Sequence, residues 1–152
     1  MWDNEKKHLT ATSNMLYEYH VRPSALVPLW SLAGRVLGGV TAALGPKSAM
    51  ACTEAVETVI GEHYDEYVSA DSQLAHLEQI RTKMSASDSV NAVELEDAFE
   101  LLRTVLVEFR DDELEHLDTA VEHDAQQAPA HAFLSVIVGY GCKGAIEVAK
   151  RV

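Results

Sequence analysis

A carboxylate and an imidazole occur at the same spacing in two distant segments of the chain. A Glu-x-x-His motif is found at Glu5 and His8 and again at Glu113 and His116, in each case with an aspartate two residues before the glutamate. Of the seven histidines, only these two follow a glutamate by three residues. Side chains three residues apart share one face of a helix, so each motif could hold one metal ion.

The positions around the motifs favour a buried site. A stripe of apolar residues, Leu102, Leu106 and Phe109, continues at helical spacing into the second motif, and Glu57 is the only charge on an otherwise uncharged face formed by Met50, Thr53, Ile60 and Tyr64. Burying unpaired carboxylates costs several kcal/mol each. A single Glu-x-x-His is more often a surface pair, but two copies beside a lone core glutamate favour a metal site.

The ligand types narrow the choice of metal. Carboxylates with imidazoles suit iron or manganese better than calcium. Only two cysteines are present, Cys52 and Cys142, and they are too far apart in sequence for a Cys-x-x-Cys motif. Neither a structural zinc site nor a disulfide framework is indicated.

Apolar residues recur three and four apart along most of the chain, which predicts an all-α protein. Proline, glycine and serine-rich segments divide the pattern, and 85–89 is the clearest linker. Pro129 is expected in the first turn of the last helix. The expected helices are 2–20, 27–44, 47–67 with an extension toward 83, 91–123 and 129–150.

Composition limits the size and the partners of the molecule. A chain of 152 residues fits a single domain, 1–152, with a buried core. Its net charge of -12 would repel a phosphate backbone, so no nucleic-acid partner is expected. The first residues match neither a secretory signal nor a transit peptide. A targeting segment, if the protein is imported, is expected to lie outside this sequence.

Four stretches of sequence carry a resemblance to a known family. They are MWDNEKKHL, VRPSALVPLWSLAGRVLGG, AMACTEAVETVIGEHY and FRDDELEHLDTAVEHDAQQAP, and the likeness extends from Met1 to Val152. The chain resembles the demethoxyubiquinone hydroxylases, ferritin-like di-iron monooxygenases of coenzyme Q biosynthesis. The resemblance implies a ferritin-like helical bundle.

The resemblance also implies a role for individual residues. Its ligand positions are Glu5 and His8 as one pair, Glu57 as a lone ligand, and Glu113 and His116 as the second pair. These are the residues that spacing had already selected.

Two further residues become catalytic candidates through the resemblance. His63 and Tyr64 correspond to residues near the metals and are expected to relay protons or electrons, with ordinary core packing as the alternative. Asp3 and Asp111 could orient the ligand histidines, or be exposed.

The chemistry implied is hydroxylation of a demethoxyubiquinone, 2-polyprenyl-3-methyl-6-methoxy-1,4-benzoquinol, with O2 at two iron ions and NADH as electron donor. The expected partners are this substrate, a membrane surface and other coenzyme Q biosynthesis proteins, with a homo-oligomer left open. The expected location is the matrix side of the mitochondrial inner membrane, as a peripheral protein. The apolar segment 27–44, whose only charge is Arg35, is a candidate membrane surface but a poor span.

The sequence departs from the family pattern at its start. The family has another helix before the position of Met1, which bears a fourth carboxylate. We therefore expect a bundle in which the first core helix is missing and five of six ligands are present, as in a fragment, a short product or a paralogue that has lost catalysis.

Two other functions compete with the hydroxylase. One is a non-catalytic protein that binds quinone lipid or assists complex assembly, and the other is a ferroxidase or peroxidase of the wider ferritin-like group. The hydroxylase would contain stoichiometric iron, whereas the non-catalytic protein would not. A ferroxidase or peroxidase would oxidise iron without requiring a quinone.

Overall fold

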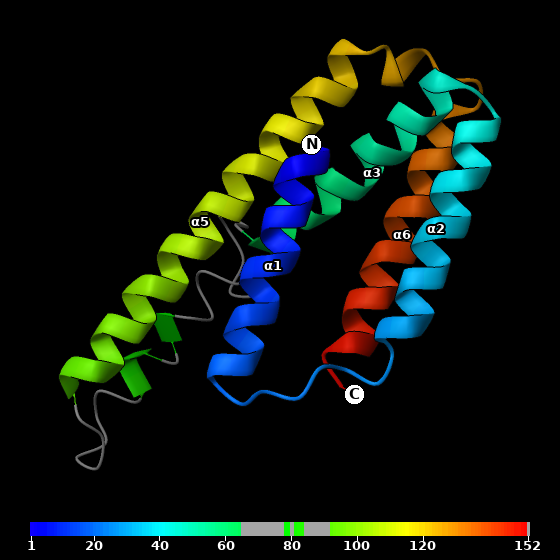
Figure 1. The fold of residues 1–152 in the computed structure, drawn as a ribbon. Helices are drawn as coiled ribbons and strands as arrows, with labels where there is room; N and C mark the ends of the chain where they lie inside the picture. Colours follow the sequence, from blue (N-terminus) through cyan, green and yellow to red (C-terminus); the bar gives the residue numbers. More distant parts are fainter. Residues whose placement is uncertain (65–77, 80, 84–91, 152) are drawn as a thin grey trace.

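The chain forms a bundle of α-helices, as the sequence predicts (Figure 1). The structure is a computed structural model that describes residues 1–64, 78–79, 81–83 and 92–151, with side chains of the last span described from residue 97. No strand occurs in these residues. The elements are α1 (Trp2–Glu18), α2 (Val27–Ala43), α3 (Pro46–Tyr64), α5 (Ala92–Glu122), the 3-10 helix η1 (Ala125–Gln127) and α6 (His131–Ala149).

The breaks between the first three helices lie where the sequence placed them. Helix α1 ends at Glu18, and His20 adopts a left-handed conformation with φ 54° before the chain reaches Pro23. Pro28 lies in the first turn of α2, where a missing N–H costs no helical hydrogen bond. Gly45 turns the chain into α3 at φ +115°, a conformation that residues with a Cβ rarely adopt.

The start of the last helix differs from the prediction. Pro129 was expected in its first turn, but α6 begins at His131. Ala130 takes a left-handed conformation at φ 56°, which separates Pro129 from the helix. The predicted linker 85–89 and the extension of the third helix from 65 to 67 lie outside the described residues.

Helix α3 lies at the centre of the packing. Its buried face carries small side chains, which allow close approach of the neighbouring helices: Ala51, Cys52, Ala55 and Val59. Val138 of α6 and Leu37 of α2 pack against this face, while α5 runs along another side of α3. A central helix with three neighbours can present side chains to all of them, and this arrangement positions the site described below.

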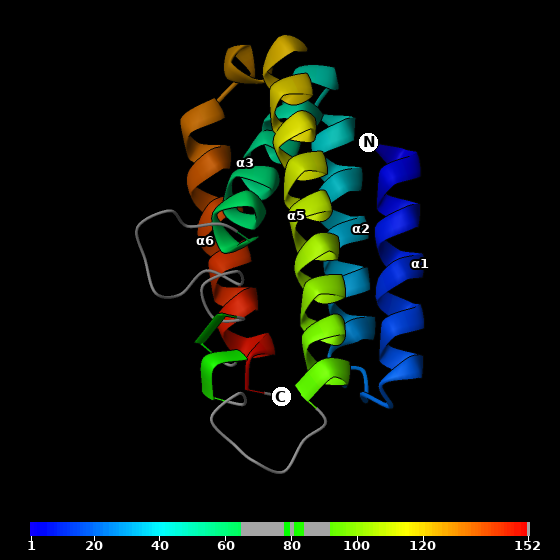
Figure 2. The same cartoon turned by 90° about the vertical axis from the view of Figure 1, so that its left-hand side faces the viewer.

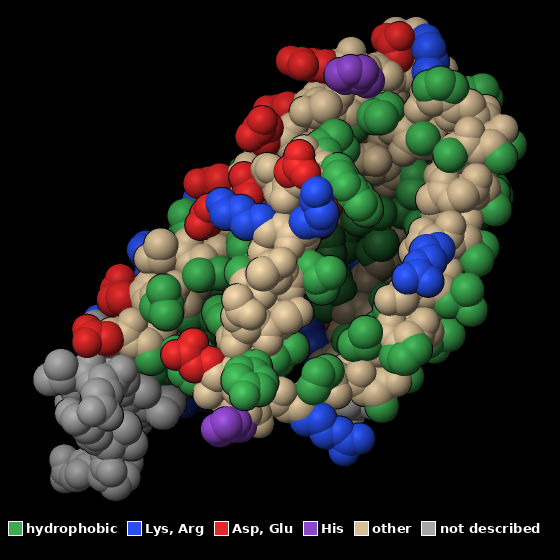
Figure 3. All heavy atoms as spheres, viewed as in Figure 1, with side chains coloured by type: hydrophobic (Ala, Val, Ile, Leu, Met, Phe, Trp, Pro, Cys, Tyr) green, Lys and Arg blue, Asp and Glu red, His purple; other side chains and the backbone are tan. Residues whose placement is uncertain are grey.

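Helix α1 is attached to the bundle differently from the others. Figure 2 shows it on one side of α5, with α6 on the other. Its only buried residue is His8, and its contacts with α5 include Lys7 with Glu108 and His8 with Asp112. A space-filling view shows a hollow between α1 and α2 with hydrophobic side chains on its walls (Figure 3). The contacts between α1 and α5 thus include ion pairs and the packing of the His8 ring on Phe109.

Candidate metal centre

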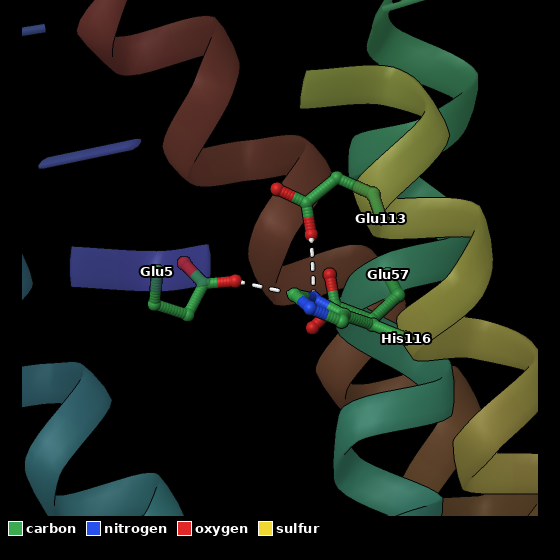
Figure 4. A group of neighbouring side chains, drawn as sticks. All are labelled: Glu5, Glu57, Glu113 and His116. Carbon is green, nitrogen blue, oxygen red and sulfur yellow. Dashed lines mark ion pairs between the residues drawn. The ribbon is translucent and has the colours of Figure 1, made fainter. Parts of the chain in front are cut away.

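Three helices bring four of the predicted ligands together. Glu5 comes from α1, Glu57 from α3, and Glu113 and His116 from α5 (Figure 4). Each offers one ligand atom, and these atoms all lie within 4.8 Å of one another. Among the described residues, this is the one group of three or more such side chains that could hold a metal ion.

The α5 pair forms the most buried part of the cluster. Glu113 is 5% exposed and His116 is 1% exposed. The Nδ1 atom of His116 lies 3.3 Å from Glu113 Oε2 and 3.2 Å from Glu5 Oε1, but neither contact is aligned as a hydrogen bond. Within the described part of the chain, both ring nitrogens of His116 lack a hydrogen-bond partner. A buried imidazole of this kind has unused lone-pair capacity that a metal ion would satisfy.

The carboxylates of the cluster repel one another in the absence of a cation. Burial raises the pKa of Glu57 to about 9, with further contributions from a hydrogen bond to Glu113 and from the charges of Glu113 and Glu5. Burial, followed by the charge of Glu113, also raises the pKa of Glu5. A divalent cation among these oxygens would favour the ionised forms.

His8 lies at the edge of the cluster. Its Nδ1 atom is 3.4 Å from Glu113 Oε1, and its Nε2 atom is 2.8 Å from Asp112 Oδ2. It does not belong to the group whose ligand atoms lie within 4.8 Å of one another. The predicted ligand His8 therefore lies next to the cluster, and Glu113 is the cluster residue that it contacts.

Sequence reasoning missed Asp112 and pointed to two other aspartates. Asp3 pairs with Lys6 at 2.6 Å and Asp111 pairs with Arg110 at 2.7 Å, and both carboxylates are exposed. Asp112 instead contacts His8. Its spacing contained a signal, because position 112 lies three residues after Phe109 and so adjoins the apolar stripe.

The structure separates the two catalytic candidates. Tyr64 is half-buried and meets Phe109 edge-on at 6.5 Å, and burial with the charges of Glu113, Glu5 and Glu57 raises the pKa of Tyr64 to about 12. His63 lines a groove of about 280 Å³ between α3 and α6, together with Lys143 and Glu147. Tyr64 is thus near the carboxylates, whereas His63 faces α6.

The donor set fits iron or manganese. Three carboxylates and at least one neutral imidazole are ligands that these ions accept, and the two cysteines are free and lie outside the cluster. An all-α bundle that gathers a Glu-x-x-His pair from one helix and carboxylates from others has the architecture of the ferritin-like carboxylate proteins. Fold and site together define this class.

The family follows from the sequence comparison. The family model described as "Ubiquinone biosynthesis protein COQ7" matches residues 1–149. The chain belongs to this family, and the resemblance to demethoxyubiquinone hydroxylases is confirmed.

Curated relatives agree with this assignment. A mouse (Mus musculus) protein named "NADPH-dependent 3-demethoxyubiquinone 3-hydroxylase, mitochondrial" is 42% identical over 99% of this chain and 60% of its own length. The "5-demethoxyubiquinone hydroxylase, mitochondrial" of Saccharomyces cerevisiae is 37% identical over 100% of this chain and 61% of its own length. The "3-demethoxyubiquinol 3-hydroxylase" of Rhodospirillum rubrum is 37% identical over 100% of this chain and 60% of its own length. The chain spans about 60% of the length of these relatives.

Proposed function

We propose that this chain carries the metal-binding part of a monooxygenase that hydroxylates the ring of a demethoxyubiquinone in ubiquinone biosynthesis. The observation that carries the proposal is the cluster of Glu5, Glu57, Glu113 and His116 in a bundle of the matching family. Within it, Glu113 and His116 are buried and Glu57 is partly buried, whereas Glu5 is exposed, in contrast to the fully buried site that the sequence predicted. The names of the relatives from mouse, yeast and R. rubrum support the substrate class.

The residues divide between two iron ions. Glu5 with His8 would hold one ion, Glu113 with His116 would hold the other, and Glu57 would be a further ligand. When bound, iron would supply the electrons that activate O2. The protein's own part is to hold the ligands in place, and it shields Glu113 and His116 almost fully from water.

Tyr64 and His63 are proposed to relay protons or electrons to the cluster. The phenol of Tyr64 lies near the cluster, whose carboxylates contribute with burial to its raised pKa, and its O–H can donate a hydrogen bond there. His63 follows the other side of α3, along the groove shared with α6. The two neighbouring residues would therefore link the cluster with an outer surface.

A Tyr64→Phe variant tests this relay. Phenylalanine keeps the edge-on packing against Phe109 and removes only the hydroxyl. We expect turnover to fall about 100-fold, as for the loss of a proton-transfer group, while iron content stays unchanged. The matched control is Tyr140→Phe, at an exposed tyrosine on α6. Undiminished turnover in Tyr64→Phe would refute the relay.

The electron donor is proposed to be a reduced nicotinamide. NADH is the donor that the family resemblance implies, whereas the mouse relative is named as dependent on NADPH. These donors differ by one phosphate group. Both therefore belong in an assay, and their relative rates decide which one this chain uses.

A membrane surface is proposed as the place where the quinone is met. Helix α2 exposes a row of apolar side chains, Val27, Leu29, Leu32, Val36 and Val40. Helix α6 is long and apolar enough to cross a membrane by length and composition, since an 18-residue stretch of it has a mean hydropathy of 1.4, with 6% of that stretch buried. Exposed apolar helix faces of this kind suit contact with lipid. The names of the mouse and yeast relatives include the word "mitochondrial", which supports a mitochondrial location. Within the mitochondrion, the matrix side of the inner membrane is proposed because the quinone substrate is a lipid.

Charges introduced into α2 test the membrane contact. Leu32 and Val36 are 59% and 56% exposed. Burial of such a side chain contributes about 1.5–3 kcal/mol, so Leu32→Glu with Val36→Glu should weaken flotation with phosphatidylcholine vesicles at least about ten-fold. Leu101→Glu, at an exposed leucine on α5, is the control. Equal flotation of all three proteins would exclude α2 as the contact.

The function is tested directly with the purified chain. It is loaded with Fe2+ and supplied with a short-tailed demethoxyubiquinone, O2 and either nicotinamide donor, and the quinone products are separated by chromatography. The hydroxylated ring is the expected product. Stoichiometric iron without hydroxylation contradicts the enzyme, and iron oxidation that needs no quinone favours a ferroxidase.

A further inference from the structure

The imidazole of His8 is held by carboxylates on both of its nitrogen atoms. Its Nε2 lies 2.8 Å from Asp112 Oδ2, at hydrogen-bond distance, and its Nδ1 lies 3.4 Å from Glu113 Oε1. The side chain of His8 is 9% exposed and that of Asp112 is 21% exposed, so water competes little for the contact. Asp112 and Glu113 are neighbours on α5, so both nitrogens of the His8 ring contact the same turn of that helix.

Packing fixes the plane of this ring. The rings of His8 and Phe109 have their centroids 4.0 Å apart and their planes inclined by 32°. Phe109 is itself 5% exposed, and it lies three residues before Asp112 on α5. A stacked ring between two carboxylates cannot rotate without losing both its packing and its hydrogen bond.

His116 lacks a comparable partner. It is more deeply buried than His8, but both of its ring nitrogens have no hydrogen-bond partner among the residues that the structure describes. Its Nδ1 lies 3.2 Å from Glu5 Oε1 and 3.3 Å from Glu113 Oε2, without hydrogen-bond alignment. The two histidines of the repeated motif are therefore inequivalent, although their spacing in the sequence is the same.

We propose that Asp112 is a positioning residue for His8, because its carboxylate accepts the Nε2–H and leaves Nδ1 unprotonated on the side of Glu113 and the metal cluster. The proposal rests on the metal centre put forward above. A carboxylate on the outer nitrogen of a ligating histidine fixes both the tautomer and the orientation of the ring. The exposed neighbour Asp111, which pairs with Arg110, has no such role.

The inequivalence predicts a selective effect on metal binding. Loss of Asp112 should weaken the ion held by Glu5 and His8 and spare the ion held by Glu113 and His116. Outer partners of metal ligands contribute about 10–100-fold in affinity, so one binding step should weaken by that factor and the other by no more than about three-fold.

The tautomer of His8 is the first measurement, and it needs no metal. In the 15N-labelled, metal-free chain at mildly alkaline pH, long-range 1H–15N spectra should show the Nε2–H tautomer. Asp112→Ala should lose this preference. Asp112→Asn should largely keep it, because the amide oxygen can still accept a hydrogen bond from Nε2–H. An Nδ1–H tautomer in the wild type, or an unchanged spectrum in Asp112→Ala, would overturn the proposal.

The second measurement is a Co2+ titration followed by calorimetry and by visible absorption. The chain, Asp112→Ala and the control Asp111→Ala are compared, with helix content checked by circular dichroism. Selective loss of one step in Asp112→Ala supports the proposal, and equal binding by all three proteins overturns it. A wild-type chain that binds no Co2+ refutes the metal centre itself, whereas the tautomer still decides whether Asp112 orients His8.

Discussion

Replacing Glu113 or His116 with alanine is expected to abolish both metal binding and hydroxylation. These side chains are 5% and 1% exposed and lie on one face of α5, where their ligand atoms meet those of Glu5 and Glu57. Since loss of an outer partner alone costs about 10–100-fold, loss of a direct ligand should exceed about 100-fold in affinity. Metal content after reconstitution and dialysis, measured by mass spectrometry, checks the expectation.

The matched control for these variants is Glu115→Ala. Glu115 is an exposed carboxylate between the two ligands in the same helical turn, so Glu115→Ala changes the net charge as much as Glu113→Ala does. It should retain metal and activity. Stoichiometric iron in either Glu113→Ala or His116→Ala would contradict the assignment of the cluster as the metal centre.

Glu57→Gln is expected to stabilise the metal-free protein while it removes function. The glutamine is close in shape to the protonated carboxyl and can still donate a hydrogen bond to Glu113, but it carries no charge at any pH. The variant should unfold at higher urea concentration than the wild type at pH 7 to 8 and should bind iron poorly. Stability and function thus make opposite demands on this position.

The raised pKa of Glu57 also predicts that the free energy of unfolding of the metal-free protein decreases as the pH rises. The pKa of Glu57 is about 9 in the folded chain, against an ordinary value of 4.5. The folded state therefore holds a proton that the unfolded state has lost. This contribution is fully present below pH 4.5 and is lost as the pH rises to about 9.

Urea unfolding across this range measures the effect. The slope should reach about 1.4 kcal/mol per pH unit in the metal-free wild type and should be much smaller in Glu57→Gln. Glu62→Gln, at an exposed position of α3, should keep the wild-type slope. A flat profile in the wild type would count against a buried, protonated Glu57.

The helices could be predicted because their ends carry strong local signals. Proline at 23, 28 and 46 and glycine at 45 limit the backbone whatever surrounds them. Both ends of α1 and α2 and the start of α3 lie within two residues of the expected positions. The start of α6 could not be predicted from Pro129. Ala130 adopts a left-handed conformation, and alanine at this position carries no local sequence signal for it.

The site was predictable to the extent that it depends on one helix at a time. Spacing places Glu113 and His116 on one face, and the isolated charge of Glu57 marks a second helix. Spacing does not say which helix lies opposite, so the pairing of His8 with Asp112 emerges only from the packing of α1 on α5. For the same reason His63, next to Tyr64 in sequence, faces α6 instead of the cluster.

The sparse attachment of α1 links metal occupancy to the position of a whole helix. His8 is the only buried residue of α1, and Met15 and Leu16 line a groove of about 450 Å³ beside Leu102 of α5. An ion shared by Glu5 and the α5 ligands would add bonds between the two helices, and the free energy of closing α1 would enter the measured affinity. If metal binding favours the docked position of α1 by some factor, then any contact that holds α1 in the docked position favours metal binding through the same coupling.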